Sequence, residues 1–312
     1  RRRRLRTCLG GPKSTRISQQ RVSKKRVSTN KISSRKATRT RVALKRTHFA
    51  GLALGGAKSD RTSLAFIEYY PEQNKIFLNE LVDKIKNEGE LPADTLIIEE
   101  LTKPQYKLGL LGINAPLTRP PCLEHKCASI EACKSDEVAW MWEHYRRQSA
   151  LKKNHKLFSP YTERWVDHYI ATELEEPFPF TQTLGANTAP IWARARYLSR
   201  HIQVPMIEVN PKVSLWRIGR ALLVQKSHLR FHKHQVEGDT ARYAILKELV
   251  SRNIAFLYEA DIRILVENIQ AFDAFLCALT AVLQFKGQCE ERPKDLPSTG
   301  GWIEIPKADI IW

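Results

Sequence analysis

The positive charge of this sequence is confined to one end of the chain. Of its 51 Lys and Arg residues, 18 lie in residues 1–47, which contain no Asp or Glu. The 33 basic residues that follow are balanced by 33 acidic ones. Residues 48–312 are therefore formally neutral. The net charge of +18 is thus no evidence that the part of the chain able to fold binds nucleic acid.

Residues 1–47 have the composition of a disordered basic tail. They are rich in Arg, Lys, Ser and Thr and contain no aromatic residue, so they cannot bury enough apolar surface to offset the entropy lost on ordering. Three origins fit: a nucleic-acid-binding arm, an organelle transit segment, or an over-extended reading frame. We favour over-extension, with initiation near Val42 or Leu44 through a non-Met codon, because the sequence begins with Arg1.

Residues 48–312 are expected to form one domain with a sizeable core, since 42% of the whole sequence is hydrophobic. No apolar run reaches the length of a membrane helix, and no secretory signal is recognisable. We therefore expect a cytoplasmic protein with no membrane partner. The six Cys residues are too few for a disulfide scaffold. No pattern indicates an oligomeric state.

The pattern of apolar residues predicts strands first and helices later. Strands are expected at residues 48–54, 62–70, 75–78, 96–99, 107–113, 204–209 and 301–305. Helices are expected at residues 137–147, 162–176 with Thr162 as N-cap, 186–201, 238–253 and 260–286, and a further helix is expected to begin within residues 77–86. This order indicates the α/β class, with a mixed sheet covered by helices.

Three ordered motifs resemble the family of domain of unknown function 429. They are AGLALGGAKSDRTSLA at residues 50–65, GINAPLTRPPC at 112–122, and FDAFLCALTAVLQFKG at 272–287 followed by GWIEIP at 301–306. The resemblance covers roughly residues 48–312. It implies an RNase H-like mixed β-sheet flanked by helices, and the predicted activity of metal-dependent nucleases, which hydrolyse phosphodiester bonds in DNA or RNA.

The resemblance also implies carboxylates on the first strand, on the central strand before Ala-Pro and on the C-terminal helix. Such carboxylates would hold two Mg²⁺ or Mn²⁺ ions about 4 Å apart. Asp273 occupies the helix position, whereas Ala53 and Asn114 stand at the two strand positions. Glu208 at a strand end and Asp60 after the Gly-rich turn are the acids best placed to compensate. We expect Asp273 and Glu208 to be metal ligands, with Asn114 and Asp60 as further catalytic candidates.

Basic and aromatic residues are interleaved in residues 215–234, where Trp216 and Phe231 stand among five cations. The cations are Arg217, Arg220, Lys226, Arg230 and Lys233. This pattern fits a nucleic-acid partner bound by phosphate contacts and base stacking. A solvated helix face with buried aromatic residues would have the same pattern, and the sequence does not separate the two.

A Cys-rich loop offers a second metal site. Its four potential ligands for a structural Zn²⁺ are Cys122, His125, Cys127 and Cys133. The spacing differs from the standard zinc motifs, so reduced thiols or a disulfide fit the loop as well.

Two other functions remain open. A chain that lacks two expected carboxylates could be a catalytically weakened RNase H-like protein that binds nucleic acid or acts as a scaffold. The segment GLALGGAKSD also resembles the first phosphate loop of sugar kinases and actin-like ATPases, with Lys58 as a phosphate contact. A simple hairpin explains the Gly-Gly turn equally, and no second Gly-rich loop follows, so we rank this phosphotransferase below the nuclease.

Overall fold

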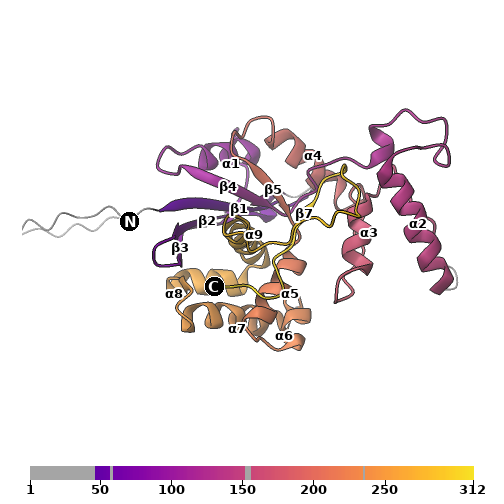
Figure 1. Cartoon of the computed structure of the whole chain (residues 1–312). Helices are drawn as coiled ribbons and strands as arrows, with labels where there is room; N and C mark the ends of the chain where they lie inside the picture. Colours follow the sequence, from indigo (N-terminus) through magenta and orange to yellow (C-terminus); the bar gives the residue numbers. More distant parts are fainter. Residues whose placement is uncertain (1–45, 57–58, 152–155, 235) are drawn as a thin grey trace, which may run out of the picture. The chain divides into compact units, whose positions relative to one another are not determined.

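A seven-stranded mixed β-sheet runs through the described part of the chain (Figure 1). The structure is a computed structural model that describes residues 46–56, 59–151, 156–234 and 236–312. Almost all of the expected disordered tail lies outside these ranges. The order of the strands is β6-β3-β2-β1-β4-β5-β7.

The first three strands form an antiparallel meander. They are β1 (Thr47–Ala53), β2 (Thr62–Tyr70) and β3 (Lys75–Ile85). Phe49 of β1 packs into the core on one face of the sheet, and Leu52 packs into the core on the other. A strand covered on both faces has no polar side, which explains the uninterrupted apolar run in the sequence.

The remaining strands are added in parallel. They are β4 (Leu108–Ile113) beside β1, β5 (Met206–Val209) beside β4, β7 (Ile303–Glu304) beside β5, and β6 (Ala255–Phe256) beside β3. The carboxyl ends of β1, β4 and β5 therefore meet at one edge of the sheet. In open α/β sheets this edge is where ligands bind.

Helices cover both faces of the sheet (Figure 1). One face carries α1 (Ala93–Leu101) and α4 (Ala189–Leu198). The other carries α5 (Pro211–Ala221), α7 (Gly238–Ser251), α8 (Glu259–Glu267) and α9 (Ile269–Phe285). The short α6 (Lys226–Phe231) packs on α5 and α7, and α2 (Asp136–Leu151) packs on α3 (Trp165–Thr172). This arrangement confirms the predicted α/β class.

Helix α9 lies directly on the sheet at two glycines. A Cβ atom on Gly51 of β1 would overlap the carbonyl oxygen of Ala274, and one on Gly112 of β4 would overlap that of Cys277. The helix backbone thus takes the space that side chains fill elsewhere in the sheet. Asp273, in the first turns of α9, is brought to the carboxyl ends of the strands in this way.

The helix expected at residues 260–286 is divided at Asn268. Its side-chain oxygen accepts hydrogen bonds from the backbone N–H groups of Gln270 (2.9 Å) and Ala271 (3.3 Å), and so begins α9 afresh. Within the described residues no single helix has the length and apolarity to cross a membrane. Helices α8 and α9 have that length and apolarity only when they are taken together, and the two helices are bent by 113° relative to each other.

Three further predictions of local structure were wrong. Residues 77–86 do not begin a helix, because β3 pairs with β2 from Lys75 to Ile85. Residues 96–99 belong to α1 rather than to a strand: the short run LIIE is compatible with both, and its buried residues Ala93, Ile97 and Leu101 follow helical spacing. Helix α3 begins later than expected, at Trp165, with Arg164 and not Thr162 as its N-cap.

Candidate functional site

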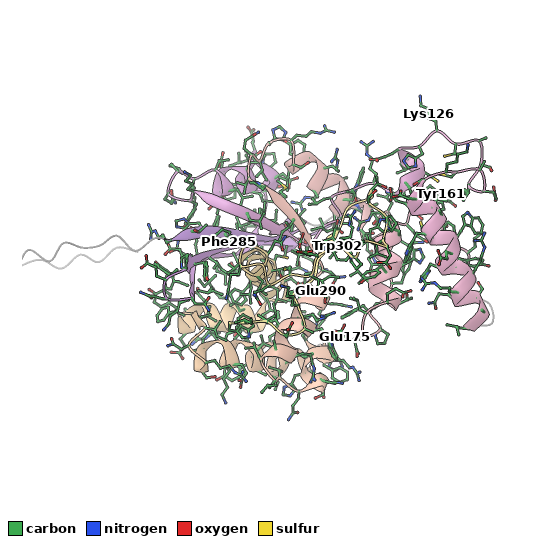
Figure 2. The ribbon with its side chains drawn as sticks, in the orientation of Figure 1. Lys126, Tyr161, Glu175, Phe285, Glu290 and Trp302 are labelled. Carbon is green, nitrogen blue, oxygen red and sulfur yellow. The ribbon has the colours of Figure 1, made fainter. Side chains whose placement is uncertain are left out.

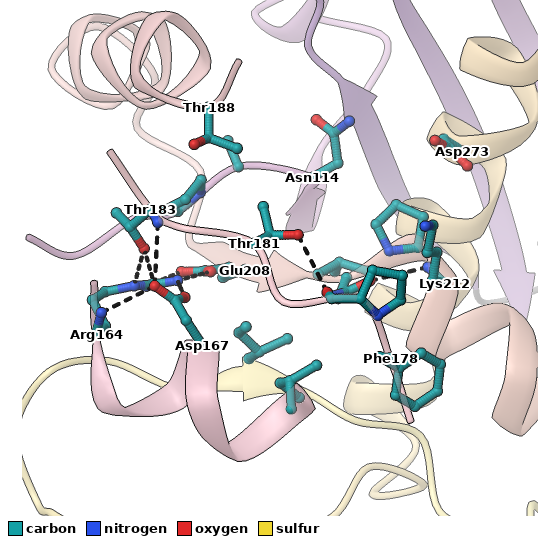
Figure 3. A pocket seen from close by; sticks show the side chains of 18 of the residues that line it. Asn114, Arg164, Asp167, Phe178, Thr181, Thr183, Thr188, Glu208, Lys212 and Asp273 are labelled. Carbon is teal, nitrogen blue, oxygen red and sulfur yellow. Dashed lines mark hydrogen bonds and ion pairs between the residues drawn. The ribbon is translucent and has the colours of Figure 1, made fainter. Parts of the chain in front are cut away.

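A cavity of about 210 Å³ lies at the carboxyl ends of β4 and β5 (Figure 3). Asn114 follows β4, Glu208 lies in β5, and Asp273 reaches the cavity from α9; all three line it. The structure therefore brings together three of the four predicted catalytic residues. The fourth, Asp60, is exposed in a short 3-10 helix (Ser59–Arg61) and does not line the cavity.

Asn114 joins the ends of β1 and β4. Its backbone N–H donates to the carbonyl oxygen of Leu52 (3.1 Å), and its side-chain Oδ1 accepts from the N–H of Leu54 (2.7 Å). Ala53 lies between these two partners on β1 and is fully buried. The two strand positions that the family resemblance assigns to carboxylates are thus adjacent, and the Asn114 side chain serves to hold the strand ends together.

Glu208 is bound by a buried arginine. Arg164 Nη2 donates to Glu208 Oε1 at 2.6 Å, and Arg164 Nη1 donates to Glu208 Oε2 at 2.8 Å. The backbone N–H of Leu117 donates to Oε2 as well, at 2.9 Å. Both carboxylate oxygens therefore have strong donors, a geometry that fixes the side chain and neutralises its charge.

Arg164 is itself held on every side. Its guanidinium donates to Asp167 Oδ1 (2.9 Å), to Thr183 Oγ1 (2.6 Å) and to Thr118 Oγ1 (2.9 Å). Burial, the largest effect, lowers the pKa of Arg164, but the charges of Asp167 and Glu208 outweigh it and leave that pKa raised. The group is a permanently charged, fully paired cation at one side of the cavity.

Asp273 faces a different environment on the opposite side of the view in Figure 3. Its Oδ2 accepts from Lys233 Nζ at 2.6 Å, while its buried Oδ1 has no hydrogen-bond partner among the described residues. Burial raises the pKa of Asp273, and the charges of Lys233 and Lys212 oppose that rise. Burial and the charge of Lys233 together lower the pKa of Lys212. Two lysines thus compete for one carboxylate.

These donors do not fit a pair of Mg²⁺ or Mn²⁺ ions. Among the described residues, no three His, Cys, Asp or Glu side chains are grouped so as to hold a metal ion. Glu208 gives both oxygens to Arg164, and Asp273 gives one to the ammonium group of Lys233. Hard divalent ions need several convergent carboxylates, whereas this cavity offers one free carboxylate oxygen beside two cations.

The Cys-rich loop does not form the predicted zinc site among the described residues. Cys122, Cys127 and Cys133 are free thiols. Burial, the largest effect, raises the pKa of Cys122. His125 is exposed, and the described residues do not place it with the three cysteines as a ligand set.

The five cations expected to bind nucleic acid do not lie together on one surface. Arg217 is buried between Glu175 (2.7 Å) and Glu290 (2.8 Å), both labelled in Figure 2. Arg230 is exposed and paired with Glu176 at 2.7 Å. Of the five, Lys233 alone lines the cavity. The other two are exposed; they are Arg220 and Lys226.

The Gly-rich turn has its own structural explanation. The N–H of Gly55 donates to Thr62 Oγ1 at 3.1 Å, so this amide is occupied within the hairpin. A side chain on Gly56 would contact Pro190 and Ile191 at the start of α4. The candidate phosphate contact, Lys58, lies outside the described residues.

Sequence reasoning missed two residues that define the site. Lys212 was overlooked, although its place in the second position of α5, directly after Asn210-Pro211, gave a usable signal: a cation at the start of a helix that follows a parallel strand lies at the ligand-binding edge. Arg164 gave no such signal. A buried arginine has the same sequence neighbours as an exposed one, and only the fold reveals its partners.

Comparison with known families confirms the resemblance over part of the chain. The family described as "Protein of unknown function (DUF429)" matches residues 188–297. The matched range contains Glu208, Lys212, Lys233 and Asp273, and ends before the GWIEIP motif. No curated protein and no solved structure matches the chain.

Proposed function

We propose that this chain, which matches the family of domain of unknown function 429 over residues 188–297, binds a single nucleic-acid strand on an RNase H-like fold without metal-dependent hydrolysis. The observation that carries the proposal is the contact between Lys233 Nζ and Asp273 Oδ2, 2.6 Å, with Lys212 close by. An ammonium group occupies the oxygen that a metal ion would need.

The sheet supports the RNase H-like fold. An antiparallel meander is followed by strands β4 and β5, both parallel to β1. The residues that the family motifs assign to the site lie at the ends of these strands: Ala53 and Asn114 are adjacent, and Asp273 reaches the same edge from α9. This arrangement supports a site with the expected frame and different charges.

The lysine side of the cavity favours an anion. The cavity is lined by three cations and three carboxylates, which balance formally, but they are unevenly placed. Lys212 and Lys233 outnumber Asp273 on one side, and Asp167 and Glu208 share Arg164 on the other. Helix α5 begins at Pro211, directly before Lys212, and the helix dipole adds positive potential at this end of the helix. The first N–H groups of α5 are capped by Asn210, so the lysines would make the direct phosphate contacts.

Binding of a fluorescent oligothymidylate, measured by anisotropy over a range of salt concentrations, tests this proposal. We expect Lys212→Ala and Lys233→Ala each to weaken binding and to reduce the slope of log K against log salt by about 0.7, the value of one released counterion on a single strand. Lys247→Ala, which removes an exposed lysine on α7 outside the cavity, is the control. Unchanged affinity in both cavity variants would refute the proposal.

A nuclease assay with Mg²⁺ or Mn²⁺ separates this function from the predicted metal-dependent nuclease. We expect no cleavage of the same oligonucleotide. Metal-dependent cleavage that Asp273→Asn abolishes would restore hydrolysis as the function of the cavity and reject a purely binding role.

A further inference from the structure

A second cavity, of about 760 Å³, adjoins the first. Phe178, Thr181 and Thr188 line both cavities, so the segment that follows α3 forms a wall between them. The first cavity, about 210 Å³, is smaller than most ligand sites, whereas the second falls in their usual range of roughly 300–1,000 Å³. The phosphate site and the larger cavity therefore lie within reach of one ligand.

Aromatic rings form much of the second cavity. Phe158, Phe178 and Phe180 line it together with the rings of His144 and His168. Phe180 is 43% exposed although it is a large apolar side chain, and it packs against His168 with ring centroids 4.7 Å apart. An exposed aromatic face inside a cavity is a stacking surface for a planar ligand.

A buried hydrogen-bond network holds this surface in place. Glu163 accepts hydrogen bonds from the N–H of Ser159 (3.0 Å) and from Gln182 Nε2 (2.6 Å), and pairs with His168 Nε2 (3.0 Å). These hydrogen bonds lower the pKa of Glu163 against the effect of burial. The carboxylate is saturated and orients the His168 ring and the Gln182 amide. The cavity thus presents fixed rings and an amide, groups that recognise the face and the edge of a nucleobase.

We propose that the second cavity receives one unpaired base of the nucleic-acid strand whose phosphate lies between Lys212 and Lys233. This inference rests on the proposed function, because the phosphate site supplies the attached backbone. The shared lining of the two cavities favours a nucleobase over an isolated apolar group. Stacking on Phe180 would hold the base on one side of the shared wall, with the adjoining phosphate beside the lysines on the other.

The experiment compares oligothymidylate with an abasic oligomer of the same length and backbone. We expect Phe180→Ala to weaken binding of oligothymidylate about tenfold, as for other lost base–aromatic stacks, and to leave binding of the abasic oligomer unchanged. Lys212→Ala should weaken binding of both. Phe256→Ala is the matched control, because Phe256 is similarly exposed (55%) but lies in β6 at the far edge of the sheet.

The outcomes separate the two proposals. If Lys212→Ala weakens both oligomers and Phe180→Ala weakens neither, the phosphate site stands and the base site is refuted. If Phe180→Ala weakens both oligomers equally, the ring supports the fold of the wall and does not stack on a base. If neither oligomer binds the wild-type protein, the proposed function itself fails.

Discussion

Glu208 and Arg164 bind each other through two hydrogen bonds, 2.6 and 2.8 Å long, with the side chains only 6% and 1% exposed. A pair this well buried differs from the ion pairs of a protein surface. Removing one partner leaves the other charge without compensation in a medium of low polarity. The pair therefore anchors β5 to the start of α3, and so fixes one side of the first cavity.

We predict that Glu208→Gln lowers the free energy of unfolding by about 3 kcal/mol, the usual effect of breaking a buried pair. Urea denaturation followed by circular dichroism measures the change. Glu248→Gln is the control: Glu248 pairs with Arg252 one turn along α7, where both side chains are about one-third exposed, and we expect a loss of about 0.5 kcal/mol or less. Equal losses in the two variants would contradict a structural role for Glu208.

Asp273→Asn should tighten binding of oligothymidylate roughly fivefold, which corresponds to about 1 kcal/mol. The change removes the negative charge that Lys233 and Lys212 now share, and leaves both cations for the phosphate. Anisotropy in the absence of divalent ions measures this effect. Asp309→Asn, at an exposed residue outside both cavities, controls for net charge. If the cavity held a metal ion, Asp273→Asn would instead weaken binding of the oligothymidylate. Adding divalent ions would then enlarge the difference between the wild type and the variant.

Gly112→Ala should destabilise the protein by about 1–3 kcal/mol, since its Cβ would overlap the backbone of α9 at Cys277. Gly109→Ala in the same strand is the control. A Cβ there would lie 3.3 Å from a methyl group of Thr47, a side chain at the end of β1. Thermal unfolding compares the two variants, and a similar melting temperature for both would show that α9 can move away from the sheet at little cost.

Glu304 in β7 should make stability depend on pH. Burial raises the pKa of Glu304 from 4.5 to about 7. The folded state thus holds this proton more tightly than the unfolded state, and the stability linked to it is complete below about pH 4.5 and lost as the pH rises to about 7. We predict that Glu304→Gln melts at a higher temperature than the wild type above about pH 7, and that the two converge in acid. Glu291→Gln, which removes an exposed carboxylate, controls for net charge. A difference that does not vary with pH would exclude Glu304 as the titrating group.

The sequence predicted those parts of the fold whose pattern has one physical explanation. The strand at residues 62–70 has the bounds of β2, and the helix at 238–253 ends two residues beyond α7. The short run at residues 96–99 failed because four apolar-rich residues fit a strand and a helix equally. The single long helix failed because Asn268 caps a new helix where the apolar pattern continues without interruption.

The site was predicted in position more fully than in chemistry. Asn114, Glu208 and Asp273 line one cavity, as motif order and strand ends suggested. Their partners come from distant segments: Arg164 lies 44 residues from Glu208, and Lys233 lies 40 residues from Asp273. A carboxylate free to bind metal and one neutralised by arginine look the same in sequence, so the predicted ligand roles depended on contacts that only the folded chain defines.

The wall that carries Phe178, Thr181 and Thr188 belongs to both cavities at once. The Glu163 hydrogen bonds already hold this region in place, so under the proposed function neither half of a nucleotide would have to order it. Joining a phosphate and a base in one strand makes the second contact intramolecular, which raises affinity without any new contact. On this proposal the site would favour the intact nucleotide unit of a strand over free phosphate and free base alike.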